Sequence, residues 1–284
     1  MRILLTGANG QLGRCFQDRL PSDWELWATD TFELDITDES LVHAAVEQYK
    51  PDVIVNAAAY TAVDNAENDI PKAVLVNEVG PKHLATAAEK YKVGFIHVST
   101  DYVFDGYSTT PYSEHDLTNP LGVYGKTKLA GEAAVLQVHP EAIIIRTAWV
   151  FSEYGNNFVK TMIKLGSTRD SLGIVSDQYG CPTYAGDIAQ SIIDLISFKA
   201  APGIYHFCGD KEVSWFEFAD KIFKEAMNLR VLLNNPVING LTTEQYPTLA
   251  KRPKYSVLDC SKIRKYNILP SDWQRALLHV LRKI

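Results

Sequence analysis

The stretch RILLTGANGQLG at residues 2–13 decides the fold. Residues 2–6 have an apolar centre and no turn residue, which is typical of a short buried strand. Gly7 ends this strand, Gly10 lets the backbone approach a pyrophosphate, and Gly13 lets the following helix pack closely on the sheet. The N-terminus of that helix offers free N–H groups and a positive dipole end to phosphates. The stretch therefore predicts the first unit of a dinucleotide-binding domain.

The glycine spacing is G-x-x-G-x-x-G instead of G-x-G-x-x-G, so an ordinary glycine-rich turn is the alternative. The position of Asp30, which ends the next apolar run at residues 24–30, favours a dinucleotide site over an ordinary turn. An acid roughly 20 residues after the loop is where the adenosine ribose hydroxyls are held. The predicted cofactor-binding residues of this part of the chain are Gly7, Asn9, Gly10, Gln11, Leu12, Gly13, Asp30 and Asp35.

Further strand-like runs at residues 52–56, 94–98 and 142–146 each follow a helical segment. Apolar strands that alternate with helices predict a parallel sheet covered on both faces, whose ligands bind beyond the carboxyl ends of the strands. The polar segments 56–60, 99–101 and 146–149 fall there. We expect Ala57, Ala58, Ala59 and Tyr60 to contribute to the cofactor site.

The regular alternation breaks down after about residue 150, and residues 228–260 are rich in Asn, Pro, Thr and Tyr. We predict a Rossmann-type doubly wound α/β domain at residues 1–150, with a return to the sheet near 170–200. Residues 151–170 and 201–284 would form a smaller C-terminal α/β substrate domain.

The composition narrows the class of protein. The chain has 284 residues, 46% of them hydrophobic, and a net charge of −6, which gives no electrostatic footprint for nucleic acid or an anionic membrane. No apolar run approaches the roughly 20 residues that span a bilayer, and Met1 leads directly into a strand, so no signal peptide is expected. The four cysteines form no CxxC pair, and His206 and Cys208 fit a packed core pair better than a metal site. We therefore expect a cytoplasmic protein with reduced thiols and no metal.

Tyr124 and Lys128 lie four residues apart on a predicted helix, so both side chains can point toward one substrate carbonyl. An ammonium beside a phenol would lower a pKa that is ordinarily about 10, and would make the tyrosine a usable acid and base near neutral pH. The pair alone is a weak signal, because a solvated helix face also produces it. Together with the glycine loop and with Thr100, whose hydroxyl follows the strand at 94–98, it indicates a reacting unit.

The whole chain resembles the extended short-chain dehydrogenase/reductase superfamily, and within it the dTDP-4-dehydrorhamnose reductase family. The strings that carry the resemblance are NAAAYTAVD (56–64), STDYVFDG (99–106), VYGKTKLAGE (123–132), RTAWV (146–150), GNNF (155–158) and AKRP (250–253). The resemblance implies Thr100, Tyr124 and Lys128 as catalytic residues, with Tyr124 and Lys128 also contacting the cofactor. It implies Thr100, Asp101, Trp149, Asn156, Asn157, Gln178 and Arg252 as substrate-binding residues.

Asn77 is also predicted to bind the cofactor, and its assignment and that of Trp149 leave alternatives. Asn77 either lines the cofactor site or is a solvated helix residue, and Trp149 either packs on the sugar or belongs to the core. Arg252 suits the diphosphate of a nucleotide sugar, because a guanidinium binds phosphate oxygens bidentately.

The resemblance implies reduction of the C4 ketone of dTDP-4-dehydro-6-deoxy-L-mannose to dTDP-L-rhamnose, a precursor of cell-surface polysaccharide. Related 4,6-dehydratases have Thr-Asp-Glu where this chain has Thr100-Asp101-Tyr102, and a phenol cannot replace the glutamate as the base for elimination. The alternatives are another nucleotide-sugar reductase, an epimerase, or a non-catalytic NADP-binding regulatory subunit.

The cofactor is NADPH or NADH. Asp30 favours NADH because it would repel a 2′-phosphate, whereas Arg14 would pair with that phosphate, so use of both is expected. Some relatives hold magnesium at a dimer contact, but the matching positions here are Cys15 and Gly186, with only Asp187 adjacent. A monomer or a metal-independent homodimer is therefore expected.

Overall fold

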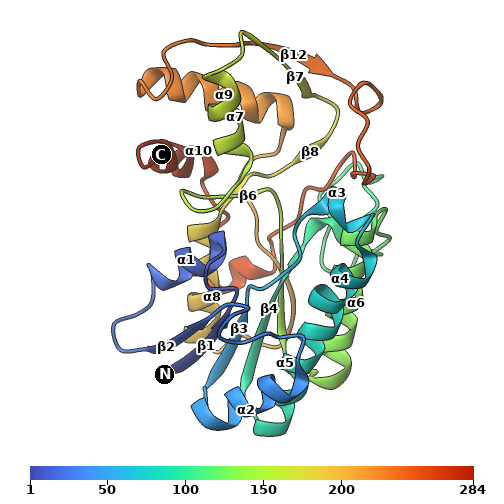
Figure 1. Ribbon diagram of the computed structural model, residues 1–284, viewed down its shortest axis with the longest axis vertical. Helices are drawn as coiled ribbons and strands as arrows, with labels where there is room; N and C mark the ends of the chain where they lie inside the picture. The colour runs from blue at the N-terminus through green and yellow to red at the C-terminus, as the bar shows by residue number, and fades with distance from the viewer.

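Six parallel strands form the central sheet of the protein, which the computed structural model describes over residues 1–284 (Figure 1). The strands of the sheet are β1 (Arg2–Thr6), β2 (Glu25–Thr29), β3 (Val53–Asn56), β4 (Gly94–Thr100), β5 (Ile143–Thr147) and β10 (Gly203–His206). Their order across the sheet is β10-β5-β4-β3-β1-β2. The strands predicted from the apolar runs are therefore confirmed, and so is the doubly wound α/β fold.

The sheet reverses its winding direction at β1. The chain passes from β1 to β2 on one side and then crosses to β3 on the other side, so that β1 pairs with both strands. Loops that leave neighbouring strands in opposite directions open a crevice at the carboxyl edge of the sheet, and ligands of such folds bind there. The glycine loop after β1 and the residues after β3 lie at this point.

Helices cover both faces of the sheet (Figure 1). On one face lie α1 (Gln11–Gln17) and α8 (Ala185–Ser197), and on the other lie α2 (Glu39–Tyr49), α5 (Gly80–Tyr91) and α6 (Val123–Val138). Burial on both faces explains the continuously apolar strands, since all five residues of β5 are buried.

The segment between β3 and α5 is a run of short helical turns. It contains α3 (Val63–Ala66), α4 (Ile70–Val74) and a π-helical turn, η1 (Leu75–Val79), that continues into α5. A π turn widens the helix locally and changes the direction of its side chains, and such turns are frequent at functional sites. This turn carries Asn77.

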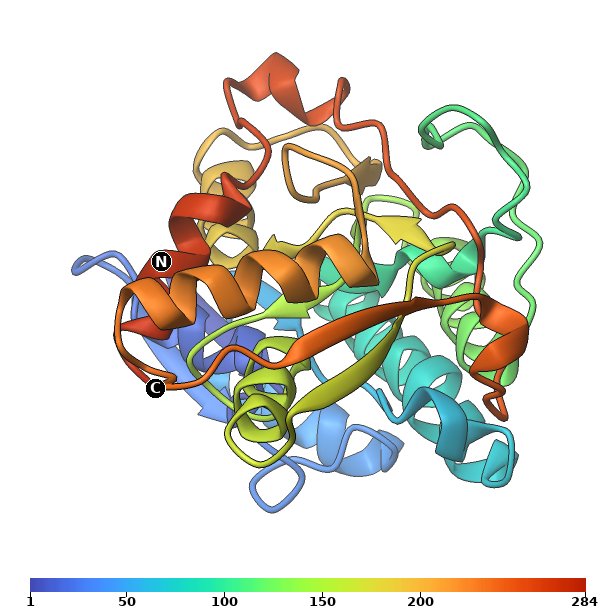
Figure 2. The same cartoon turned by 90° about the horizontal axis from the view of Figure 1, so that it is seen from above.

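A second lobe lies beyond the carboxyl edge of the sheet (Figures 1 and 2). It contains α7 (Phe158–Gly166), α9 (Trp215–Asn228), α10 (Trp273–Leu281) and the parallel pair β7 (Ser171–Val175) and β12 (Val237–Leu241). These elements share a hydrophobic core of their own, in which Phe218 and Leu277 are fully buried. Ser214 caps α9 in a reciprocal arrangement with Glu217, as a capping box does.

The remaining elements are short. They are the parallel pair β6 (Val150–Phe151) and β9 (Thr183–Tyr184), the antiparallel pair β8 (Tyr179–Gly180) and β11 (Val213–Ser214), and the 3₁₀ turns η2 (Asp101–Val103), η3 (Thr243–Gln245) and η4 (Ile263–Tyr266).

The chain returns to the main sheet at residues 185–206, and not over the whole of the expected range of 170–200. β7 pairs with β12 in the second lobe, whereas α8 and β10 rejoin the Rossmann domain. The residues of β7 alternate between exposed and buried over most of its length, which suits a strand with one covered face and not the centre of a sheet covered on both.

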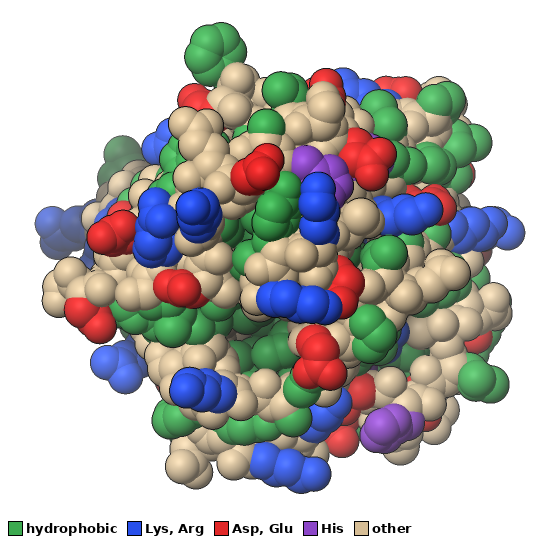
Figure 3. Space-filling view, turned by 90° about the horizontal axis from the view of Figure 1, so that it is seen from below, with side chains coloured by type: hydrophobic (Ala, Val, Ile, Leu, Met, Phe, Trp, Pro, Cys, Tyr) green, Lys and Arg blue, Asp and Glu red, His purple; other side chains and the backbone are tan.

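None of the helices combines the length and the apolar character that crossing a bilayer requires. On the face drawn in Figure 3, acidic and basic side chains are interspersed without a large area of one sign. All four cysteines are buried free thiols, and Cys208 lies 3.6 Å from Cys260.

Candidate active site

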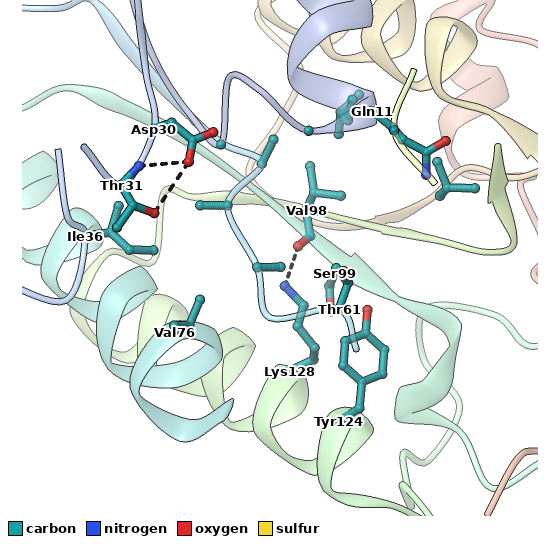
Figure 4. A pocket seen from close by; sticks show the side chains of 18 of the residues that line it. Gln11, Asp30, Thr31, Ile36, Thr61, Val76, Val98, Ser99, Tyr124 and Lys128 are labelled. Atoms are coloured by element: carbon teal, nitrogen blue, oxygen red, sulfur yellow. Dashed lines mark hydrogen bonds between the residues drawn. The ribbon is translucent and has the colours of Figure 1, made fainter. Parts of the chain in front are cut away.

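A cavity of about 750 Å³ opens at the carboxyl edge of the sheet, along the crevice at β1 (Figure 4). Asp30 lies toward one end of this cavity, and Tyr124 and Lys128 lie toward the other. Of the candidate residues, those that line it are Gly7, Gly10, Gln11, Leu12, Asp30, Asp35, Ala57, Ala58, Ala59, Tyr124, Lys128 and Asn156. The structure thus gathers most of the predicted cofactor residues around one space.

The glycine loop needs its glycines for different reasons. Gly7 has a φ of +72°, and a Cβ there would lie 2.6 Å from the Ala58 nitrogen. At Gly13 a Cβ would lie 2.2 Å from the carbonyl oxygen of Gly7, so any side chain would push α1 off the loop. At Gly10 the nearest such atom is 3.3 Å away, and the residue lines the cavity. Gly10 therefore leaves room for a ligand, whereas Gly7 and Gly13 leave room for backbone.

Asp30 joins the end of β2 to the glycine loop. Its Oδ2 accepts a hydrogen bond from the Asn9 nitrogen at 3.0 Å, and its Oδ1 accepts one from the Thr31 nitrogen at 2.8 Å. Arg14 does not line the cavity, because its Nε donates to the Asn9 carbonyl and its guanidinium lies over the ring of Tyr154. The carboxylate, and not the guanidinium, faces the ligand space.

Gln11 links α1 to the second lobe. Its Oε1 accepts hydrogen bonds from Ser152 Oγ and from Asn157 Nδ2, both at 2.9 Å. Asn157 also caps α7, since its Oδ1 accepts from the Lys160 nitrogen. Asn157 is therefore occupied by the protein itself, whereas the neighbouring Asn156 lines the cavity.

Asn77 neither lines the cavity nor lies in solvent, contrary to both expected alternatives. It is fully buried, and its amide holds both backbone groups of Tyr60, with Oδ1 accepting from the Tyr60 nitrogen and Nδ2 donating to the Tyr60 oxygen. Nδ2 also donates to Thr127 Oγ1 at 3.2 Å. The π turn aims this amide inward, so that Asn77 fixes the loop after β3 against α6. Tyr60 likewise does not line the cavity.

Tyr124 lies in the first turn of α6, next to the end of β4. Burial raises the pKa of Tyr124 to about 12, and hydrogen bonding to Thr100 opposes the rise. The Thr100 hydroxyl donates to Asp101 Oδ1 at 3.0 Å and accepts from the Tyr102 nitrogen at 3.2 Å. The phenol of Tyr124 is therefore protonated at neutral pH and sits beside a hydroxyl that is already oriented.

The pKa of Tyr124 is raised by burial and not lowered, contrary to the sequence-based expectation for Lys128. The Nζ of Lys128 donates to the Val98 carbonyl at 2.7 Å and lies 3.3 Å from His97 Nε2. Figure 4 shows the side chain turned toward β4. Burial lowers the pKa of Lys128 to about 8, so the nitrogen is less basic than an ordinary lysine. The four-residue spacing from Tyr124 predicts the helix face on which Lys128 lies, but it does not predict the direction in which the amine points.

Asp101 is a buried carboxylate beside the reacting residues. It is 2% exposed, and its Oδ2 has no hydrogen-bond partner. Burial raises the pKa of Asp101 to about 6. An unpaired buried oxygen is costly, and groups of this kind concentrate at functional sites.

The other expected substrate residues lie outside the cavity lining. Trp149 stacks on Trp215 with ring centroids 3.4 Å apart and has a φ of +46°, an uncommon conformation for a bulky residue. Gln178 donates to Thr243 Oγ1 at 3.2 Å. Arg252 forms an ion pair with Asp64 at 2.7 Å, so its guanidinium already has an anionic partner.

Some lining residues were not named individually as candidates, although Ser99 and Thr147 belong to segments that the sequence places at this edge. These lining residues are Thr31, Leu34, Ile36, Thr37, Thr61, Lys72, Leu75, Val76, Val98, Ser99, Thr147, Val150, Gly155 and Ile188. Most of them lie one or a few positions from a predicted residue, so the strand-end rule could have found them. Lys72 has no such signal, because it comes from a short helix whose position depends on the tertiary fold.

The positions at which the resemblance led us to look for magnesium ligands are Cys15, Gly186 and Asp187. Burial raises the pKa of the Cys15 thiol to about 12, and a Cβ at Gly186 would lie 2.2 Å from Arg19 Nη2. Asp187 accepts a hydrogen bond from Ser271 Oγ at 2.6 Å. No group of three or more His, Cys, Asp or Glu side chains is arranged to hold a metal ion.

Comparison with known proteins adds to this geometry. The family model described as the RmlD substrate binding domain matches residues 1–284. A dTDP-4-dehydrorhamnose reductase of Aggregatibacter actinomycetemcomitans is 50% identical over 287 residues, covering 98% of each chain. The solved dTDP-4-dehydrorhamnose reductase of Clostridium acetobutylicum superposes with a TM-score of 0.94 at 41% identity, covering 99% of each chain. That of Bacillus anthracis, solved in complex with NADP, gives 0.93 at 37% identity, covering 100% of this chain and 99% of the other. The chain therefore belongs to the dTDP-4-dehydrorhamnose reductase family.

Proposed function

We propose that this protein reduces the C4 ketone of dTDP-4-dehydro-6-deoxy-L-mannose to dTDP-L-rhamnose, with NADPH or NADH as reductant. The observation that carries the proposal is the single cavity that joins the glycine loop and Asp30 to Tyr124. A dinucleotide extended between these ends would bring its nicotinamide to the phenol. Relatives of this family bear the name of that reaction.

The residues present fit a dinucleotide. Gly10 leaves backbone open to a pyrophosphate, Asp30 offers oxygens to ribose hydroxyls, and Ala57 to Ala59 leave space where larger side chains would fill the crevice. When bound, the reduced nicotinamide supplies the hydride, and the protein supplies position and proton.

The protonation state of Tyr124 suits reduction. A phenol whose pKa is raised to about 12 by burial carries its proton at neutral pH and can donate it to the oxygen of a ketone as negative charge develops there. Thr100 lies beside it and would polarise the same oxygen once its single hydroxyl proton turns from Asp101 to the substrate. Asp101 fixes the Thr100 hydroxyl from behind.

Elimination of water is disfavoured at this site. Dehydration needs a base at the position that Tyr102 occupies, and the ring of Tyr102 packs edge-on against Tyr124 at 5.6 Å. Burial raises the pKa of Tyr102 well above its usual range, so it cannot serve as that base near neutral pH.

We assign the substrate side of the site to the second lobe, with Asn156 at the cavity and Trp149, Gln178 and Arg252 further out. For the diphosphate to bind Arg252, the Asp64 carboxylate must share or release the guanidinium. We further propose a cytoplasmic enzyme that is a monomer or a metal-independent homodimer.

The test is incubation with dTDP-4-dehydro-6-deoxy-L-mannose and each reduced nicotinamide, with cofactor oxidation followed by absorbance and the product identified by NMR. Stoichiometric formation of dTDP-L-rhamnose is expected, and the Tyr124→Phe variant serves as control. Conversion of a nucleotide sugar without net oxidation of cofactor would indicate an epimerase. Tight NADP binding without turnover of any nucleotide sugar would indicate a regulatory subunit.

A further inference from the structure

A chain of buried polar side chains crosses the middle of the sheet. It runs from Thr6 on β1 through Asn56 on β3 and His97 on β4 to Lys128 on α6. Each of the four is at most 1% exposed. Thr6 Oγ1 lies 2.7 Å from Asn56 Oδ1, Asn56 Nδ2 lies 2.9 Å from His97 Nδ1, and His97 Nε2 lies 3.3 Å from Lys128 Nζ. Polar groups buried this deeply are costly unless each is paired, so the direction of every bond matters.

The backbone fixes the orientation of the Asn56 amide. The Ala58 N–H lies 3.1 Å from Asn56 Oδ1, and a backbone N–H can only donate. Rotating the amide by half a turn would place its NH₂ group against this N–H, so Oδ1 must be where the structure has it. Nδ2 therefore faces His97 and donates to His97 Nδ1.

The proton of His97 is then placed on Nε2. Burial lowers the pKa of His97 well below its ordinary value, so the imidazole is neutral and carries one N–H. Because Nδ1 accepts from Asn56, that N–H is on Nε2, which points at Lys128 Nζ. An ammonium has three donors and no acceptor, so it would meet another donor here. A neutral amine has a lone pair that accepts from Nε2–H, while one of its own hydrogens bonds the Val98 carbonyl.

We propose that His97 is a positioning residue for Lys128, whose Nε2–H, fixed through Asn56 by the Ala58 amide, donates to the lysine nitrogen and favours the neutral amine. An amine that changes charge near neutral pH can accept and release a proton during turnover, which a permanently charged amine cannot. The inference rests on the proposed function only in taking Lys128 as a catalytic residue.

The other charged and titratable groups around Lys128 are few. Tyr124 and Glu132 lie one turn before and one turn after it on α6, and Arg146 on β5 neutralises Glu132 in a buried ion pair. Glu132 raises the Lys128 pKa and burial lowers it. His97 is the group on β4 that contacts the amine directly, so its substitution should change the amine most selectively.

The first experiment measures the tautomer in the wild-type protein. In ¹⁵N-histidine-labelled protein, long-range ¹H–¹⁵N spectra should show His97 with a protonated Nε2 and a bare Nδ1 at every pH at which the protein is folded. His206 is a matched internal reference, because its Nδ1 faces the Tyr112 carbonyl at 3.0 Å and should carry the proton instead. The chain has seven histidines, so the His97 and His206 signals are assigned as those lost in His97→Asn and in His206→Asn, with His97→Gln used if His97→Asn does not fold. A proton on His97 Nδ1 would overturn the proposal whether or not the enzyme is active on the expected sugar.

The second experiment measures kcat/KM against pH. His97→Asn keeps an amide near Asn56 but is too short to reach Nζ, so the ammonium gains stability. The ionisation assigned to Lys128 should move upward by about one pH unit, the equivalent of one ordinary hydrogen bond. Thr6→Val is the control, since it removes the far end of the chain but leaves the Ala58 bond that orients Asn56. It should lower the melting temperature without moving the ionisation. A His97→Asn profile that is lower at all pH values but not displaced would overturn the proposal.

Discussion

Glu132→Gln should destabilise the protein strongly, because it removes the charge that compensates Arg146. The carboxylate of Glu132 is 2% exposed and Arg146 is 3% exposed. Arg146 donates from Nε at 3.0 Å and from Nη2 at 2.7 Å, and Ser99 Oγ donates to the same carboxylate. The pair ties α6, which carries Tyr124 and Lys128, to β5.

The expected size follows from this burial. Breaking a buried ion pair at one partner typically costs about 3–5 kcal/mol, because the remaining charge stays in a low dielectric. That is a large part of the roughly 5–15 kcal/mol by which proteins are stable. At roughly 2–4 °C per kcal/mol for a chain of this size, the melting temperature should fall by about 6–20 °C.

Urea and thermal unfolding of three variants would test this reasoning. Asp220→Asn, which breaks the exposed pair with Lys224, should cost less than about 1 kcal/mol. The double variant Glu132→Leu/Arg146→Met should recover most of the stability lost in Glu132→Gln, since apolar pairs replace buried ion pairs well. A loss below about 1 kcal/mol in Glu132→Gln, or a double variant that is no better than Glu132→Gln, would refute the argument.

Four further predictions concern the site. Tyr124→Phe should lower turnover by at least about 100-fold and leave the cofactor dissociation constant nearly unchanged, whereas a variant with a tenth of wild-type activity would remove the phenol from the acid role. Asp30→Ala should weaken NADH relative to NADPH by about tenfold in binding titrations, and Arg14→Ala should not change the preference; equal effects would mean that another residue reads the ribose. Because burial raises the Asp101 pKa to about 6, the free energy of unfolding should fall by about 2–3 kcal/mol as pH rises from about 4 through about 6. Urea unfolding of Asp101→Asn should lack this fall. Activity and oligomeric state should survive a chelator, because Asp187 is bonded to Ser271; a rate or a dimer that collapses in rate assays or gel filtration would contradict this.

The fold could be predicted because its signals are local. The strand at residues 2–6 and the glycine loop after it each depend on a few adjacent residues. Apolar runs without alternation indicate strands covered on both faces, and the structure has them. The roles of the individual site residues remain predictions, although most of the cofactor candidates line one cavity.

What the sequence did not predict depends on contacts between distant segments. Lys128 turns to Val98 and His97, so its partners belong to β4 and not to its own helix. Asn77 points inward because a π turn changes the register of the helix, and no residue type signals that turn. The raised pKa of Tyr124 follows from burial, which a helical spacing does not report.

The return of α8 and β10 to the main sheet has a consequence for the design of chimeric enzymes and for natural recombination between relatives. α8 covers one face of the sheet, and β10 forms its edge beside β5. A chimera with one junction near residue 150 would take these two elements from one parent and the sheet that they complete from the other. Because the proposed substrate side of the site lies in the second lobe, exchange of substrate specificity between relatives calls for two segments to be transplanted, one on each side of residues 185–206, with those residues kept from the original parent.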